Sequence, residues 1–170
     1  MSRGWWRRNA IALVVLAALV PAGWFAFDTI EFGVVRNPTQ SVEASKTAHV
    51  EGAVFGVVRM TPLEVDDVAA PTGSKPVLVT IPVHRRSGEP YCMGVTVTET
   101  ATGRTWRSAS GVLTWTPGDG QQETCTSGSE PRFDLVAPVL LAGDAVGPFV
   151  VGLSVAREAD TLDLEFAVDR

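Results

Sequence analysis

The sequence predicts an all-β protein, an antiparallel sandwich of about eight short strands that follows one N-terminal transmembrane helix. Three features indicate this arrangement. Residues 9–27 carry no charge, segments after residue 47 alternate apolar and polar side chains, and turns rich in Gly and Pro separate these segments. No stretch after residue 27 sustains apolar residues at helical spacing with a capping signal, which favours a sandwich over a parallel sheet covered by helices.

Length and composition restrict the classes of protein that fit. A chain of 170 residues with 45% hydrophobic residues is long enough for one domain with a buried core, and it is too apolar for intrinsic disorder. All 19 Asp and Glu residues follow residue 27, whereas three of the 14 Lys and Arg residues precede it. The larger part of the chain is therefore acidic, which excludes binding to nucleic-acid backbones.

The first 27 residues predict a membrane anchor. Arg3, Arg7 and Arg8 lie in residues 1–8, which we expect to be cytoplasmic because basic residues flank the cytoplasmic ends of membrane spans. The uncharged run at 9–27 is close to the length that crosses the roughly 30 Å hydrocarbon layer as a helix. The predicted orientation has the N-terminus inside and the rest of the chain outside the plasma membrane.

A cleaved signal peptide is the alternative for this segment. The basic start, the apolar run and the small residues near 20–22 satisfy the loose rules for cleavage. The apolar run continues through Trp24, Phe25 and Phe27, beyond that position, as expected of an anchor. We therefore expect one membrane span, with residues 28–46 as a juxtamembrane stalk and residues 47–170 as the extracytoplasmic domain.

Alternating side chains mark the strands of the domain. In residues 161–168, Leu162, Leu164 and Phe166 face one side while Asp163 and Glu165 face the other, as in a half-buried strand. Further strands are expected at 48–60, 77–83, 93–97, 104–108, 112–116, 132–136 and 149–155. In the strand at 77–83, the proline at position 82 lacks an N–H donor and indicates an edge or a bulge.

Cys92 and Cys125 are predicted to form a disulfide, because both lie in the part of the chain expected outside the cytoplasm. Cys92 alternates with Met93 and Val95, so we expect it to point away from the core and the bridge to hold residues 117–131 across the outside of a sheet. A redox pair is the alternative, although the cysteines lack the C-x-x-C spacing and a shared basic cluster.

Residues with catalytic or metal-binding chemistry are sparse. The two histidines, His49 and His84, are not paired at metal-ligand spacing, and neither a metal nor a cofactor is expected. Ser154 lies in a sequence that loosely matches a nucleophile elbow, but it is placed inside an alternating strand. No catalytic residue is predicted.

A few residues are candidates for binding. Asp66 and Asp67, near Glu64, form an acidic cluster of the kind that coordinates calcium, but they lack a spaced ligand loop, and a solvated loop is the simpler explanation. Trp106 and Trp115 are candidate contact residues because tryptophan is enriched at binding hot spots. Both are also candidates for packing against the core.

Several segments in order resemble a known family. They are the strand at 75–83 with its turn at 87–90, the hairpin at 100–106, the segment 141–151 and the strand at 162–166. Together they resemble the bacterial immunoprotective-extracellular-protein type of Ig-like sandwich, over about residues 47–168. At 142–144 this chain has Ala-Gly-Asp where the family turn has a proline. The resemblance implies a secreted or membrane-tethered Ig-like sandwich in Gram-positive-type bacteria and carries over no catalytic residue.

The expected function is that of an accessory module of the bacterial cell envelope, held by one membrane span and binding an envelope protein. One alternative is an envelope protein that binds a ligand such as calcium, or an unrecognised hydrolase that uses His84, Ser154 or the Asp66 and Asp67 pair. A structural spacer is a further alternative. Because the sequence shows no set of catalytic residues, the interaction module is the favoured interpretation.

Overall fold

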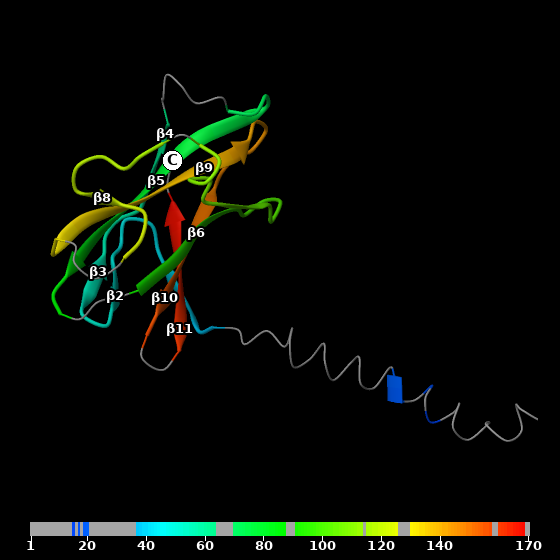
Figure 1. Cartoon of the computed structure of the whole chain (residues 1–170), viewed down its shortest axis with the longest axis horizontal. Helices are drawn as coiled ribbons and strands as arrows, with labels where there is room; N and C mark the ends of the chain where they lie inside the picture. Colours follow the sequence, from blue (N-terminus) through cyan, green and yellow to red (C-terminus); the bar gives the residue numbers. More distant parts are fainter. Residues whose placement is uncertain are drawn as a thin grey trace, which may run out of the picture. The chain divides into compact units, whose positions relative to one another are not determined.

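Eleven strands form two sheets in the residues described by a computed structural model of the chain, shown in Figure 1. The described residues are 15, 17, 19–20, 37–63, 70–87, 91–113, 115–125, 130–157 and 160–168. The strands are β1 (Thr39–Val42), β2 (Ala48–Val50), β3 (Ala53–Phe55), β4 (Arg59–Pro62), β5 (Ser74–Arg85), β6 (Tyr91–Glu99), β7 (Thr105–Arg107), β8 (Gln121–Gln122), β9 (Arg132–Ala142), β10 (Phe149–Ala156) and β11 (Thr161–Val168).

The two sheets have different strand orders. The five-stranded sheet has the order β1-β11-β10-β6-β7, and the six-stranded sheet has the order β2-β3-β5-β9-β8, with β4 also paired to β5. The all-β class and the two sheets are confirmed. The prediction of a purely antiparallel sandwich is wrong in two places, because β1 pairs with β11 and β8 pairs with β9 in parallel.

The number of strands also differs from the predicted eight. The predicted strand at 48–60 is divided into β2, β3 and the start of β4. Glu51 and Gly52 adopt positive φ angles of 40° and 81° and turn β2 back onto β3. Strand β1 lies in the segment predicted as a stalk, where only Val42 of its four residues is buried. The described residues of 112–116, which lack residue 114, contain no strand.

The core lies between the sheets and follows the predicted alternation. Leu162, Leu164 and Phe166 of β11 are buried, as are the odd-numbered residues of β5 from Val79 to Val83. The largest fully buried side chains come from both sheets and include Phe55, Phe166, Ile81, Leu135, Leu153 and Leu164.

A β-bulge at Gly94 reverses the predicted facing of the first part of β6. Met93 pairs with Ser154 and Val95 pairs with Leu153, so Gly94 is an extra residue between two consecutive pairs. Its φ of 56° lies in the left-handed region that favours glycine. The extra residue shifts the alternation by one, so Cys92 points into the core while Met93, predicted to be on the core face, is 41% exposed.

Substitution of Gly94 tests this bulge. We expect Gly94→Ala to lower the free energy of unfolding by about 1 kcal/mol, because a side chain disfavours the left-handed conformation. Crowding does not contribute, since no atom lies within 4 Å of a Cβ built there. Gly94→Asn should cost less, because asparagine tolerates this conformation. Denaturant unfolding compares the three proteins, and equal losses for Ala and Asn would contradict the explanation.

The predicted anchor at 9–27 and the arginines Arg3, Arg7 and Arg8 fall almost entirely outside the described residues. Of the anchor, only Val15, Ala17, Leu19 and Val20 are described, and they are helical. In the described parts of the chain, no helix reaches the length and hydropathy of a membrane span.

Candidate functional site

An open cleft with a volume of about 510 Å³ lies on the six-stranded sheet. Its floor consists of residues 82–84 of β5 and 132–134 of β9, in which the even-numbered side chains face away from the core, and Val54 and Gly56 border it on the β3 side. Asp119 and Gly120, which precede β8, border it on the other side. The cleft is therefore built on the outer face of this sheet.

The sheet register orders the cleft into two rows. In the first row, His84 lies directly opposite Val54 on β3 and Arg132 on β9. In the second row, two residues along the strands, Pro82 lies opposite Asp134. Rows separated by two residues of a strand are roughly 7 Å apart.

On the β3 side of the cleft, the pairing of β5 is interrupted. Strand β3 pairs with β5 up to Val83 and β4 pairs only up to Thr80. Between them, the Gly56 N–H donates to the Pro82 carbonyl over 2.6 Å. Pro82 lies in an interior strand, and its missing N–H falls at this interruption, where the continuous ladder is absent.

A glycine is required at position 56 for the same reason. A Cβ added to Gly56 would lie 3.0 Å from the Pro82 Cβ, closer than ordinary van der Waals contact. A larger side chain at position 56 would therefore press against Pro82 in the second row of the cleft.

The opposite wall is fixed by hydrogen bonds and by the disulfide. The Gly118 N–H donates to the Gln121 side-chain oxygen over 3.0 Å, and the Asp134 N–H donates to the Gly120 carbonyl over 2.9 Å. Three residues after β8, Cys125 is bonded to Cys92 of β6. The wall is thus connected to both sheets.

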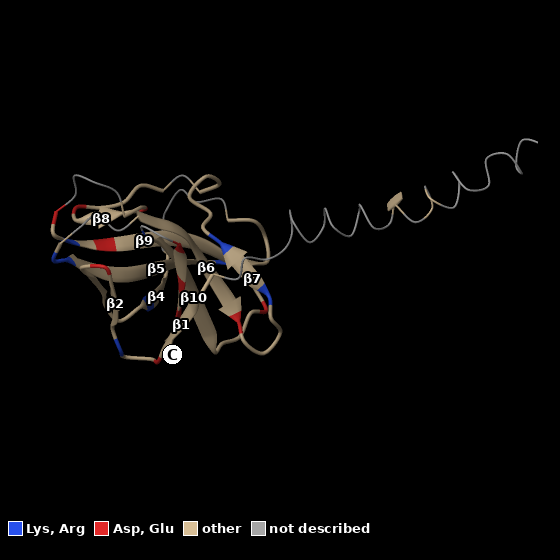
Figure 2. Ribbon diagram, turned by 90° about the horizontal axis from the view of Figure 1, so that it is seen from below, with Lys and Arg blue, Asp and Glu red and all other residues tan. Residues whose placement is uncertain are grey.

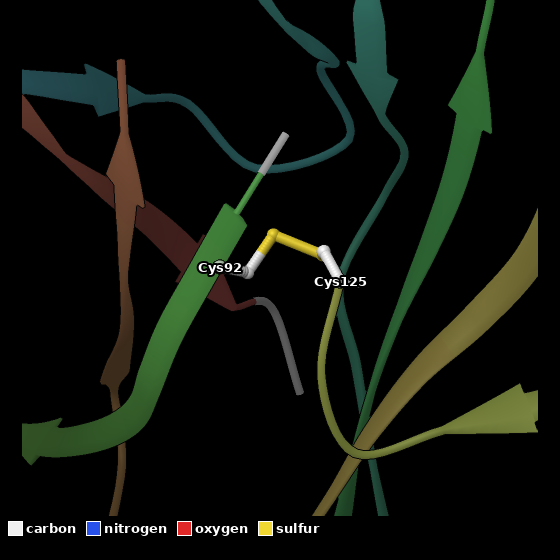
Figure 3. The surroundings of a disulfide bond; sticks show 2 residues. All are labelled: Cys92 and Cys125. Carbon is white, nitrogen blue, oxygen red and sulfur yellow. A yellow bond between two sulfur atoms is a disulfide. The ribbon is translucent and has the colours of Figure 1, made fainter. Parts of the chain in front are cut away.

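The predicted disulfide is confirmed, but its predicted placement on the outside of a sheet is wrong. Figure 3 shows the two side chains meeting between the β6 ribbon and the segment that follows β8. Cys92 is 4% exposed and Cys125 1% exposed, and both belong to the hydrophobic core. The bulge at Gly94 accounts for the difference, since it turns Cys92 inward.

The cleft has a hydrogen-bond-donating end and an accepting end. His84 and Arg132 form the first row and Asp134 lies in the second, whereas Asp119 lies on the wall that precedes β8. Among the described residues, none of these four side chains forms a hydrogen bond or ion pair with another. Figure 2 shows basic and acidic positions together at this end of the sheet, near β8 and β9. The four groups are available to a ligand.

Metal binding by these groups has no support in the geometry. Within the ranges described above, no three His, Cys, Asp or Glu side chains lie close enough together to hold a metal ion. The cleft therefore offers separate donor and acceptor groups for a polar ligand.

A second polar cluster lies at the β6–β7 turn and is satisfied internally. Glu99 is 2% exposed, and its carboxylate accepts hydrogen bonds from Thr102 Oγ1, from Arg104 Nε at 2.9 Å and from the Val146 N–H at 2.7 Å. Arg104 also contacts Asp144 Oδ1 at 2.8 Å. The cluster connects the β6–β7 turn to the β9–β10 loop.

The same contacts set the acidity of Glu99. The hydrogen bond from Thr102 and the one from the Val146 N–H, together with the neighbouring Arg104, lower the pKa of Glu99 from 4.5 to about 2, against the opposing effect of burial. Glu99 is thus held as a carboxylate, and its lone pairs are occupied by protein donors. The cluster links two loops of the fold through the buried Glu99 carboxylate.

The predicted binding residues lie elsewhere. Trp106 packs against the core at the rim of the sandwich, with the Arg104 guanidinium carbon 5.5 Å from its ring centre. Trp115 is partly exposed between β7 and β8. Neither tryptophan lines the cleft. Asp66 and Asp67, with Glu64, lie outside the described residues.

Of the two described residues considered for the alternative functions, His84 lines the cleft and Ser154 does not. Ser154 lies on β10 of the other sheet, where its hydroxyl donates to Asp163 Oδ1 over 2.6 Å. Asp119, Arg132 and Asp134 were not predicted as site residues from the sequence. The alternation of 132–136 places residues 132 and 134 on the polar face of a strand. This pattern could have identified them as candidate site residues.

In the comparisons with known proteins, no protein-family model, curated sequence or solved structure matched the chain.

Proposed function

We propose that this chain is a membrane-anchored, extracytoplasmic interaction module of the bacterial cell envelope that binds a partner protein through the cleft on the six-stranded sheet. The observation that carries the proposal is the cleft itself. It combines about 510 Å³ of open volume with four polar side chains that have no partner among the described residues. Concave sites with a few convergent polar groups are the usual place of ligand binding.

The strand order supports the Ig-like part of the proposal. Strands β4, β5, β9 and β8 lie in one sheet and β6, β10 and β11 in the other. The order of these strands is that of the ABED and CFG sheets of immunoglobulin domains, except that β8 pairs with β9 in parallel where the D and E strands are antiparallel. Ig-like sandwiches are widespread as interaction domains on cell surfaces, which agrees with a binding role.

The disulfide and the N-terminal sequence support the proposed location. A buried disulfide between the sheets persists in an oxidising compartment. The basic residues before the uncharged run at 9–27 orient the chain with residues 28–170 outside.

Site-specific photo-crosslinking in intact cells tests the function. A photoreactive residue replaces Val54, which is half-buried and lines the cleft, in the full-length protein. We expect a discrete adduct with one envelope protein, identified by mass spectrometry, because a bound partner covers this position.

The matched control carries the same residue at Glu165, an exposed position on β11 in the other sheet. This position should yield no such adduct. Equal adducts from both positions, or none from Val54 while Glu165 gives one, would overturn the assignment of the cleft as the binding site.

A further inference from the structure

We propose that the cleft recognises an extended peptide segment that carries one acidic and one basic side chain two residues apart. The inference rests on the proposed function and specifies its ligand. It follows from the positions of the four polar groups, from their lack of internal partners and from the geometry of β-strands.

The acidic side chain of the segment fits the first row. His84 and Arg132 lie directly opposite each other on neighbouring strands, so their side chains project side by side. Both present N–H donors, and the Arg132 guanidinium can hold a carboxylate with two parallel hydrogen bonds. A carboxylate between them would bind both groups.

The basic side chain fits the second row. Asp134 faces the cleft beside Pro82, and Asp119 lies on the wall joined to β9 by the Asp134 N–H to Gly120 carbonyl bond. A carboxylate accepts hydrogen bonds only, so Asp134 favours an ammonium or guanidinium group in this row.

The spacing of the rows selects an extended ligand. They are roughly 7 Å apart, the distance between side chains at positions i and i+2 on one face of a β-strand. Side chains at i and i+1 point to opposite faces and cannot occupy both rows. Val54 in the first row and Pro82 in the second offer apolar contact to the ligand.

Blocked peptides with defined charges test this proposal on the full-length protein in detergent or nanodiscs. The set contains Thr-Glu-Val-Lys-Thr, Thr-Lys-Val-Lys-Thr, Thr-Glu-Val-Glu-Thr and the adjacent-charge peptide Thr-Glu-Lys-Val-Thr. By fluorescence anisotropy at low salt, the first should bind about tenfold more tightly than each of the others. Equal binding of all four, or no binding, would overturn the proposal.

Charge-reversal variants should change the preference in a defined way. Arg132→Glu makes both rows acidic and should favour the peptide with two lysines, whereas Asp134→Lys should shift the preference toward the peptide with two glutamates. The controls Arg107→Glu and Glu165→Lys make the same changes in net charge at exposed positions of the other sheet. They should leave the order of affinities unchanged.

The outcomes separate this inference from the proposed function. An adduct formed from position 54 together with indifference to peptide charge would reject the peptide chemistry and leave the binding function standing. If the control variants change the preference as strongly as the cleft variants, the effect reflects the net charge of the protein and the proposal is wrong. Thermal unfolding of each variant shows whether a lost preference comes from a lost fold.

Discussion

Replacing Cys92 and Cys125 with alanine is expected to lower the free energy of unfolding by about 4 kcal/mol. The disulfide closes a loop of 33 residues, and its loss restores the corresponding chain entropy to the unfolded state. The effect should extend to the cleft, because the wall that contains Asp119 leads directly into Cys125. We expect the variant to bind the mixed-charge peptide less tightly than the wild type.

Chemical denaturation of the full-length protein, with and without a reducing agent, measures this effect. The reductant should destabilise the wild type to nearly the level of the double alanine variant and should leave the variant unchanged. If the reductant does not change the stability of the wild type, and the double alanine variant is as stable as the wild type, the disulfide contributes nothing to stability.

Substitution of Glu99 by glutamine is expected to lower the melting temperature at pH 7 by on the order of 10 °C. The amide has nearly the same size but carries no charge, and one of its two terminal atoms is a donor. It cannot satisfy Thr102, Arg104 and the Val146 N–H together as the carboxylate does. The loss should be large because Glu99 is buried.

The same residue predicts a pH dependence. Because the pKa of Glu99 is about 2 in the folded protein and 4.5 ordinarily, its contribution to stability is complete above pH 4.5 and is lost as the pH falls toward 2. Melting temperatures of the wild type should therefore fall across this window. Glu99→Gln should remove this part of the decline.

Glu165→Gln is the matched control, since Glu165 is exposed on β11. It should change neither the melting temperature at pH 7 nor the slope between pH 4.5 and 2 by a comparable amount. A wild-type slope that persists unchanged in Glu99→Gln would assign the acid sensitivity to other carboxylates.

The sequence predicts the local part of this fold well. The alternation in 161–168 identified the strand and its buried face, because successive side chains of a strand point to opposite faces and every second residue is therefore apolar. Strand β1 was missed for the same reason, since three of its four residues are exposed and give no apolar alternation. Met93 was assigned to the core because an inserted residue at Gly94 does not show in the alternation of Val95 and Val97.

The candidate site was less accessible to sequence reasoning. Asp134 and Arg132 meet Pro82 and His84 only through the register of β9 on β5, and these strands are about fifty residues apart in the chain. A clearer signal existed for the second cluster. Glu99 continues the inward series of Val95 and Val97, and a carboxylate at a core position requires donors nearby.

The way the chain enters the sandwich determines how the domain bears tension. Strand β1 runs parallel to β11, with Thr39 beside Asp163 and Val42 beside Phe166, and the Asp163 N–H donates to the Pro38 carbonyl. A pull on the chain ahead of Asn37, against a load at the end of β11, slides one strand along the other. Their hydrogen bonds then resist in shear and must break together, whereas an antiparallel hairpin peeled from its end opens one bond at a time. The four residue pairs between β1 and β11 therefore share this load.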